Sequence, residues 1–302
     1  MKTKIKFWGV RGSLASAGPQ TAKYGGNTPC LEIKYDKTVI ICDAGTGIRA
    51  LGEHYHPLPG PPPSRGREKG NSSPSSSRGE GWGEGNLKAT ILLSHIHFDH
   101  VIGLPFFEPL YNKHNSFTII SPEFSGSDLH YYLGNLISPP YFPISILSVP
   151  ASLNFKSMPA RGLHIDKIKV QTFRCNHPDG SYAFKFHLPS GKTLVHISDN
   201  EPIPQLEKSL TPWLQDTDVL IHDAQYTPEQ YKTKIGWGHS PFTYPIRLAS
   251  QAGIKKLIMF HYDPGATDKD LDKLKTEARK FIRKEKLKLE VELAREGMSL
   301  TL

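Results

Sequence analysis

The stretch Ser94-His95-Ile96-His97-Phe98-Asp99-His100 decides the fold of this chain. It directly follows an apolar run at 89–94, which is typical of a short buried β-strand. A strand that ends in a tight loop can direct its first two imidazoles to one metal ion, while the next turn directs Asp99 and His100 to a second. Imidazole and carboxylate donors suit zinc, with iron or manganese as alternatives. The stretch therefore predicts a two-metal site at the end of a strand.

Short apolar runs recur on both sides of this stretch, and several of them end in His or Asp. They lie at 38–43, 165–174, 193–198, 218–222 and 256–260. The clearest helical pattern spans 268–285, where apolar residues recur at three-to-four spacing between many charges. Strands with interspersed helices indicate an α/β or α+β fold. Ligands at the ends of successive strands are expected to converge on one edge of a sheet.

The segment 57–86 differs in composition from the rest of the chain. It consists mostly of Pro, Gly and Ser, and its only sizeable apolar residues are Leu58 and Trp82. Such a segment buries too little surface to offset its conformational entropy. The runs on either side of it look like neighbouring pieces of one α/β unit. We therefore expect a single domain over 1–302 that carries a disordered insertion at 57–86, and we prefer an inert insertion to a substrate gate.

The whole-chain properties limit the class of protein. The formal net charge is +8, which favours acidic or phosphorylated partners through steering or simply keeps the protein in solution. The first residues lack the apolar run of a signal peptide, and no long apolar segment follows. The three cysteines, Cys30, Cys42 and Cys175, form no CxxC pair and are expected in the core. The sequence predicts a cytoplasmic protein without membrane contact; the oligomeric state is open, with a homodimer as one alternative.

Further metal-competent residues follow the histidine cluster in order: His177 in Asn176-His177-Pro178, Asp199 in the run 196–201, and His261 in the run 260–264. Each of these alone is more often an ordinary packed or turn residue. Together with the cluster, they resemble the ordered HxHxDH and later motifs of the metallo-β-lactamase superfamily. The N-terminal runs 7–13 and 24–28 resemble one branch, which holds cyclic-nucleotide and cyclic-phosphate phosphodiesterase-like proteins related to ribonuclease Z.

This resemblance implies a fold and a ligand set. The fold is a four-layer αββα sandwich with metals at one edge between the two sheets. The implied cofactors are two divalent metal ions. Zinc is the preferred assignment, with manganese or iron as alternatives. One ion is assigned to His95, His97 and His177, the other to Asp99, His100 and His261, with Asp199 bridging both.

The resemblance also implies a reaction. Two adjacent divalent ions activate a bridging water and clamp the oxygens of an in-line displacement, which suits phosphodiester hydrolysis by a metal-bridging hydroxide. Asp99 is expected to orient that hydroxide. His239, in the motif 236–240, is expected to stabilise the transition state or act as general acid, and Asp223 to orient His239. The competing interpretations are a loop histidine packed by Trp237 and a purely structural Asp223.

Substrate choice is less constrained. A small cyclic nucleotide or cyclic phosphate is the first choice, since no basic helical arm and no cluster of aromatic and basic residues for stacking single strands is evident. RNA 3′-end processing is the alternative enzyme function. A non-catalytic metal-binding regulatory module is the alternative of another class.

Five residues outside the ligand set carry weaker expectations. Asp43 is expected to tie loops below the metals, and His196 to be a core residue or one that supports a ligand. Arg11 and Asn27 are candidates for the substrate pocket, although a turn role suits Asn27 as well. Tyr262 replaces the second histidine of the FHHDP segment of close relatives, and this exchange is expected to alter the wall of the pocket. Metal binding is expected to survive because His261 is the assigned ligand; an alignment shifted by one position would leave the second metal ion one ligand short.

Overall fold

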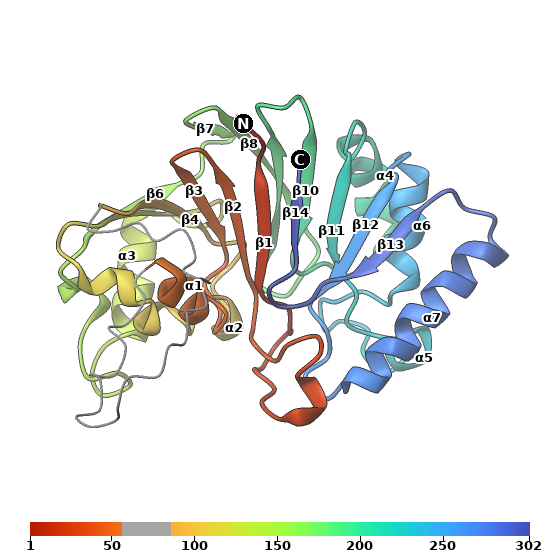
Figure 1. Ribbon diagram of the computed structural model, residues 1–302, viewed down its shortest axis with the longest axis horizontal. Helices are drawn as coiled ribbons and strands as arrows, with labels where there is room; N and C mark the ends of the chain where they lie inside the picture. The colour runs from red at the N-terminus through yellow and green to blue at the C-terminus, as the bar shows by residue number, and fades with distance from the viewer. Residues whose placement is uncertain (56–85) are drawn as a thin grey trace, which may run out of the picture.

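The structure is a computed structural model that describes residues 1–55 and 86–302 (Figure 1). Within these residues, two seven-stranded mixed sheets face each other, and helices cover the outer face of each (Figure 1). The expected four-layer αββα metallo-β-lactamase sandwich is confirmed. The predicted insertion at 57–86 lies outside the described residues, apart from Asn86. The single-domain assignment stays a prediction.

The first sheet runs in the order β14-β1-β2-β3-β4-β5-β6, antiparallel from β14 to β3 and parallel from β3 to β6. Helices α1, α2 and α3 lie on its outer side (Figure 1). The elements of this half are β1 (Lys4–Gly9), β2 (Cys30–Tyr35), β3 (Thr38–Cys42), α1 (Ile48–Tyr55), β4 (Lys88–Leu92), α2 (Phe98–Val101), β5 (Ser116–Ser121), α3 (Gly126–Leu136), β6 (Ser152–Ser157) and β14 (Ser299–Thr301).

The second sheet runs in the order β13-β12-β11-β10-β9-β8-β7, antiparallel from β7 to β10 and parallel from β10 to β13. Its elements are β7 (Leu163–Ile165), β8 (Ile168–Cys175), β9 (Ser181–His187), β10 (Thr193–Ile197), α4 (Pro204–Trp213), β11 (Val219–Asp223), α5 (Pro228–Tyr231), α6 (Thr243–Gln251), β12 (Lys256–Phe260), α7 (Asp268–Lys284) and β13 (Glu290–Leu293). Short 3-10 turns occur at Pro19–Thr21, Leu104–Phe106, Glu108–Tyr111 and Ile146–Ser148.

Two apolar cores hold the layers together. The larger core fills the space between the sheets and extends beneath α4, α6 and α7, and the smaller core lies between the first sheet and helices α1 and α3. Cys30, Cys42 and Cys175 are buried free thiols in these cores, as expected. No helix in residues 1–55 and 86–302 is long and apolar enough to span a membrane.

The strands on either side of the insertion are direct neighbours. Strand β3 pairs in parallel with β4, with Ile40 opposite Thr90 and Cys42 opposite Leu92. The expectation that both flanks belong to one α/β unit is therefore confirmed. The sheet continues across the point in the sequence where 57–86 is inserted.

One predicted strand is divided. The run 165–174 was expected to be continuous, but a turn at Asp166 separates β7 from β8, and the two strands pair as a hairpin. Asp166 adopts a φ of 50°, in the left-handed region that strands do not use, and its carboxylate accepts a hydrogen bond of 2.6 Å from the Thr38 hydroxyl. The predicted helix at 268–285 is confirmed as α7, which Thr267 and Asp270 begin with a capping box.

His196 makes the stability of the metal-free protein depend on pH. The side chain is buried in β10, and neither ring nitrogen has a hydrogen-bond partner among the described residues. Burial lowers the pKa of His196 from 6.5 to about 4. The unfolded chain therefore binds this proton at a higher pH than the folded chain, so the stability from neutral His196 is complete above pH 6.5 and is lost as the pH falls toward 4.

His196→Leu is expected to remove this dependence. In the chelator-treated wild type, protonation of His196 in the unfolded chain should lower the free energy of unfolding by about 2 kcal/mol between pH 7.5 and 5. In the variant, the free energy of unfolding should therefore fall by about 2 kcal/mol less over the same range. Urea unfolding at the two pH values measures the difference. An equal loss in both proteins would show that His196 does not contribute.

Candidate metal centre

The predicted ligands come together at one edge of the sandwich. His95 and His97 lie in the loop after β4, and Asp99 and His100 lie in α2. The remaining three ligands come from the second sheet: His177 follows β8, Asp199 follows β10, and His261 follows β12. Their potential ligand atoms form overlapping groups in which all members lie within 4.8 Å of one another.

His95, His97 and His177 form the first donor group. Nδ1 of His97 lies 3.0 Å from Nε2 of His95 and 3.1 Å from Nε2 of His177. Oδ2 of Asp199 lies 3.6 Å from Nε2 of both His95 and His177. Three imidazole nitrogens that face one another with a carboxylate beside them present lone pairs to a common point, as the ligands of a cation do.

Asp99, His100 and His261 form the second donor group. Oδ2 of Asp99 lies 3.2 Å from Nε2 of His100 and 3.3 Å from Nε2 of His261. Asp199 joins this group as well, with Oδ1 at 3.2 Å from Nε2 of His261 and Oδ2 at 3.5 Å from Nε2 of His100. Asp199 therefore lies between the two donor groups, in the place expected of a bridging carboxylate.

The chemistry of these atoms fits a cation. Nε2 of His100, Nε2 of His261 and Oδ1 of Asp199 are buried without a hydrogen-bond partner, which is rare for polar atoms unless another ligand satisfies them. Burial opposes ionisation of Asp199, but His261 and His100 outweigh it and hold the pKa of the carboxyl well below its usual range. The two donor groups and the metallo-β-lactamase fold indicate divalent metal binding.

The ligands are oriented by hydrogen bonds from behind. Oδ2 of Asp43 lies 3.1 Å from Nδ1 of His100, and Asp43 also accepts bonds from the amide and hydroxyl of Ser94 at 2.8 and 3.0 Å. Nδ1 of His177 lies 2.9 Å from the carbonyl oxygen of Gly238. Such partners fix the ring orientation of a metal-binding histidine. The expected role of Asp43 in tying loops below the metals is consistent with these contacts.

His261 adopts an unusual backbone conformation next to a required glycine. Its φ of 58° lies in the left-handed region, which is costly for a residue with a side chain. A Cβ atom on Gly12 would lie 2.4 Å from Nδ1 of His261, so only glycine fits at that position. The backbone turn thus presents the His261 ring to Asp99 and Asp199 while Gly12 closes the space behind it.

His239 and Asp223 lie beside the second donor group. Nδ1 of His239 is 3.3 Å from Oδ2 of Asp223 and 3.9 Å from Oδ2 of Asp199, and its ring stacks on His261 with centroids 5.0 Å apart. Burial acts to lower the pKa of His239, but the hydrogen bond to Asp223 and the nearby carboxylates outweigh burial and raise it. The structure therefore brings together the pair that the sequence singled out.

Glu201 is a residue of the site that the sequence did not single out. Its carboxylate accepts hydrogen bonds from the Gly236 and Gly238 amides, at 2.7 and 2.9 Å, and from the Tyr231 hydroxyl at 2.9 Å. These bonds fix the loop that carries His239 and that places the Gly238 carbonyl against His177. Glu201 follows Asp199 by two residues, which is the only signal that the sequence offered.

Replacing Glu201 with glutamine is expected to loosen this loop. One acceptor oxygen becomes a donor, so an amide of the loop loses its partner, at a cost of about 1–3 kcal/mol. Catalytic turnover should fall by about tenfold through kcat, with a smaller change in KM. The matched control is Glu229→Gln, since Glu229 is an exposed residue of α5. A proportional fall in both variants would contradict the positioning role.

Two residues that the sequence offered for the substrate pocket, Arg11 and Asn27, contact other parts of the chain. Arg11 is buried and donates to the carbonyls of Gly25, Asp263 and Ala266, and it does not line the cavity at the donor groups. Asn27 is likewise engaged, with its amide donating to Glu296 at 3.0 Å. The sequence could not distinguish a buried loop-binding arginine from one that faces a substrate.

Tyr262 points away from the donor groups. It is fully buried, and its hydroxyl donates to the carbonyls of Met259 and Ala294 at 2.7 and 2.8 Å. His261, and not Tyr262, is the residue that contacts Asp99 and Asp199. The expectation that Tyr262 changes the pocket wall is therefore wrong.

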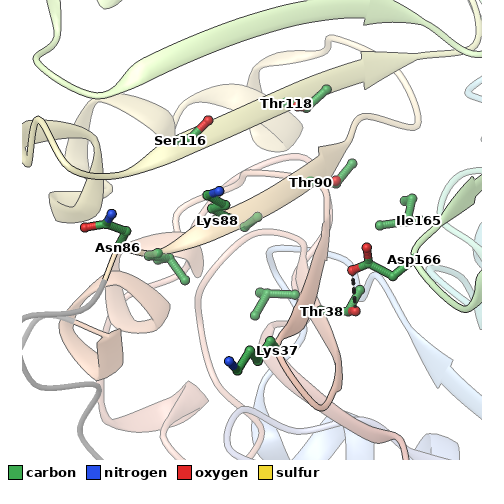
Figure 2. A pocket seen from close by; sticks show the side chains of 12 residues that line it. Lys37, Thr38, Asn86, Lys88, Thr90, Ser116, Thr118, Ile165 and Asp166 are labelled. Carbon is green, nitrogen blue, oxygen red and sulfur yellow. Dashed lines mark hydrogen bonds between the residues drawn. The ribbon is translucent and has the colours of Figure 1, made fainter.

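Two cavities of similar size lie at opposite ends of the parallel strands. The inner cavity, of about 510 Å³, opens onto both donor groups and is lined by Ser13, Ile96, His97, Phe98, Asp99, Tyr132, Leu133, Leu136, His177, Asp199 and His239. Figure 2 shows the other, of about 400 Å³, where Thr38, Lys88 and Ser116 mark the amino ends of β3, β4 and β5. Ligands of open α/β sheets bind at the carboxyl ends of strands, which favours the inner cavity as the site.

The chain belongs to the beta-lactamase superfamily, because the family model described as the Beta-lactamase superfamily domain matches residues 81–262. It is similar to the ribonuclease Z of Myxococcus xanthus, with 30% identity over 112 residues. That alignment covers 37% of this chain and 33% of the relative, so the chain spans about a third of the length of the relative that it matches.

Solved structures share the fold across the whole chain. The metallo-beta-lactamase fold protein YhfI from Bacillus subtilis superposes with a TM-score of 0.69 at 17% identity, and the alignment covers 100% of each chain. Unliganded yeast PDE1 superposes with a TM-score of 0.68 at 15% identity, covering 100% of this chain and 99% of the other. The chain thus has the metallo-β-lactamase fold, and its sequence relatives include proteins named ribonuclease Z.

Proposed function

We propose that this protein hydrolyses phosphodiester bonds in a small cyclic nucleotide or cyclic phosphate, using two divalent metal ions. Zinc is the metal that we assign to both positions. The observation that carries the proposal is Asp199, which lies between two complete donor groups at the floor of an open cavity. The first group would hold one ion and the second group the other. Two such ions would supply Lewis acidity and an activated water for an in-line displacement.

The residues of the chain divide the remaining work. The Ser13 amide donates to Oδ2 of Asp99 at 2.8 Å, which holds that carboxylate in place to orient the attacking water. His239 lines the cavity, and Asp223 engages its Nδ1, which leaves Nε2 for the substrate. His239 therefore donates a proton to the leaving oxygen, and Asp223 positions the ring.

Processing of RNA 3′ ends is the second candidate, and the relatives named ribonuclease Z favour it. The inner cavity argues for the smaller substrate. No Lys or Arg stands among the described residues that line it, whereas RNA binding depends on contacts between cationic side chains and phosphates. We therefore place RNA second.

Turnover of bis(p-nitrophenyl) phosphate, cyclic mononucleotides and a tRNA precursor by the metal-loaded protein tests the proposal. The expected result is hydrolysis of the small diesters by protein that binds two metal ions per chain. In His97→Ala, this hydrolysis and the binding of two ions should be lost. Cleavage of the tRNA precursor alone would favour RNA processing. Two bound ions without turnover of any diester would show a non-catalytic metal-binding module instead.

A further inference from the structure

A second cavity with a different character lies beside the inner cavity. Phe98 and Leu136 line both, so the two cavities are adjacent. The outer cavity measures about 610 Å³. Its lining residues come from α2, the turn after it, the end of α3 and the segment that follows: Phe98, Ile102, Pro105, Phe106, Asn135, Leu136, Ile137, Tyr141 and Phe142.

The outer cavity is apolar and exposed. Its described lining contains no Asp, Glu, Lys, Arg or His. Phe98 is 65% exposed, Phe106 is 56% exposed and Tyr141 is 82% exposed. Contiguous exposed apolar surface of this kind marks a binding site more often than a feature of folding. The ring of Phe106 meets that of Phe142 edge to face, with centroids 5.7 Å apart, so these two rings of the aromatic wall pack against each other.

We infer that the outer cavity binds an aromatic group of the substrate, while the phosphate lies at the donor groups. This inference rests on the proposed function, and it names the substrate class as phosphodiesters of low charge that carry an aromatic substituent. Ligand pockets combine apolar and aromatic walls with a few polar groups that fix orientation. Here the aromatic wall and the polar donor groups belong to two adjacent cavities that share Phe98 and Leu136.

The charge distribution favours this occupant over others. A substrate with several phosphates would place further negative charge along a wall that offers no cationic side chain. An aromatic ring instead gains from stacking on Phe98 and from covering surface that water now contacts. The lining residues shared with the inner cavity, Phe98 and Leu136, favour a part of the substrate over a second protein, since a group bound there lies next to the donor groups.

Equilibrium binding of 1-naphthyl phosphate and methyl phosphate tests the inference without turnover. The two probes carry the same phosphate and differ in the apolar group. Naphthyl fluorescence reports the first affinity, and displacement of the naphthyl probe reports the second. In the wild type, 1-naphthyl phosphate should bind at least about tenfold more tightly than methyl phosphate. In Phe98→Ala and in Phe106→Ala, this ratio should fall by about fivefold.

The matched control is Tyr131→Ala. Tyr131 is an exposed aromatic residue of α3 that lines neither cavity, so the ratio should stay at the wild-type value. A wild-type ratio near one, or a ratio that neither phenylalanine variant changes, would overturn the inference. So would conversion of a dimer to a monomer by Phe106→Ala at an unchanged ratio, because the outer cavity would then be a contact between two copies of the chain.

The outcomes also separate this inference from the proposed function. Diester turnover without a preference for the naphthyl probe would leave the function standing and remove the aromatic site. A preference for the naphthyl probe that depends on Phe98, in a protein without diester turnover, would support the aromatic site and remove the proposed function.

Discussion

Asp199→Ala is expected to lower the affinity for divalent metal more than about a hundredfold, because loss of even an orienting partner of a ligand costs about tenfold to a hundredfold. Asp199 contacts members of both donor groups, at 3.6 Å from His95 and 3.2 Å from His261. Its removal leaves the facing imidazoles without a shared anion. Metal content after dialysis and turnover of bis(p-nitrophenyl) phosphate should fall together.

Asp179→Ala is the matched control for this experiment. Its carboxylate lies 3.7 Å from Nε2 of His97, but its side chain is 93% exposed, so the contact is screened by solvent. The control should keep its metal and its turnover. Retention of both metals by Asp199→Ala would show that Asp199 is not the bridging ligand.

His239→Ala should separate catalysis from metal binding. A general acid contributes about a hundredfold to ten-thousandfold, and kcat should fall by a factor in that range while the metal content stays at the wild-type value. The loss should be greater for an alkyl leaving group than for p-nitrophenolate, because a poor leaving oxygen needs the proton more. Paired kinetics on methyl and p-nitrophenyl esters measure this difference.

Asp223→Asn provides the companion measurement. Asp223 also accepts a bond of 2.9 Å from the Ser240 amide, so the asparagine keeps the loop acceptor while it loses the charge beside His239. The pH profile of kcat should shift in this variant, which a merely structural role would not produce. Equal losses for both leaving groups in His239→Ala would identify His239 as a residue that holds structure and not as the acid.

The sequence predicted the donor groups because they depend on local features. His95, His97, Asp99 and His100 lie within one loop, and strand ends supply the other three ligands. Each such residue needs only the end of its own strand to be in the right place, and the strand ends were evident from apolar periodicity. The αββα architecture, in contrast, came from the resemblance, since composition and periodicity indicated only a mixture of strands and helices.

The residues whose roles the sequence did not predict make contacts that are remote in sequence. Arg11 binds carbonyls of Gly25, Asp263 and Ala266, and nothing near Arg11 in the sequence reveals those partners. The role of Glu201 likewise depends on a loop more than thirty residues away, which donates to it from Gly236 and Gly238. The outer cavity combines Phe98 and Tyr141, which lie more than forty residues apart in the sequence.

Each donor group draws on both halves of the sandwich. His95, His97, Asp99 and His100 follow a strand of the first sheet, whereas His177, Asp199 and His261 follow strands of the second. A folding intermediate in which only one half has formed therefore has no complete site. Metal uptake therefore measures whether the two halves have docked. Each tenfold increase in free metal above its dissociation constant stabilises the docked form by about 1.4 kcal/mol. The metal centre that we propose for catalysis would then also stabilise the contact between the two halves of the sandwich.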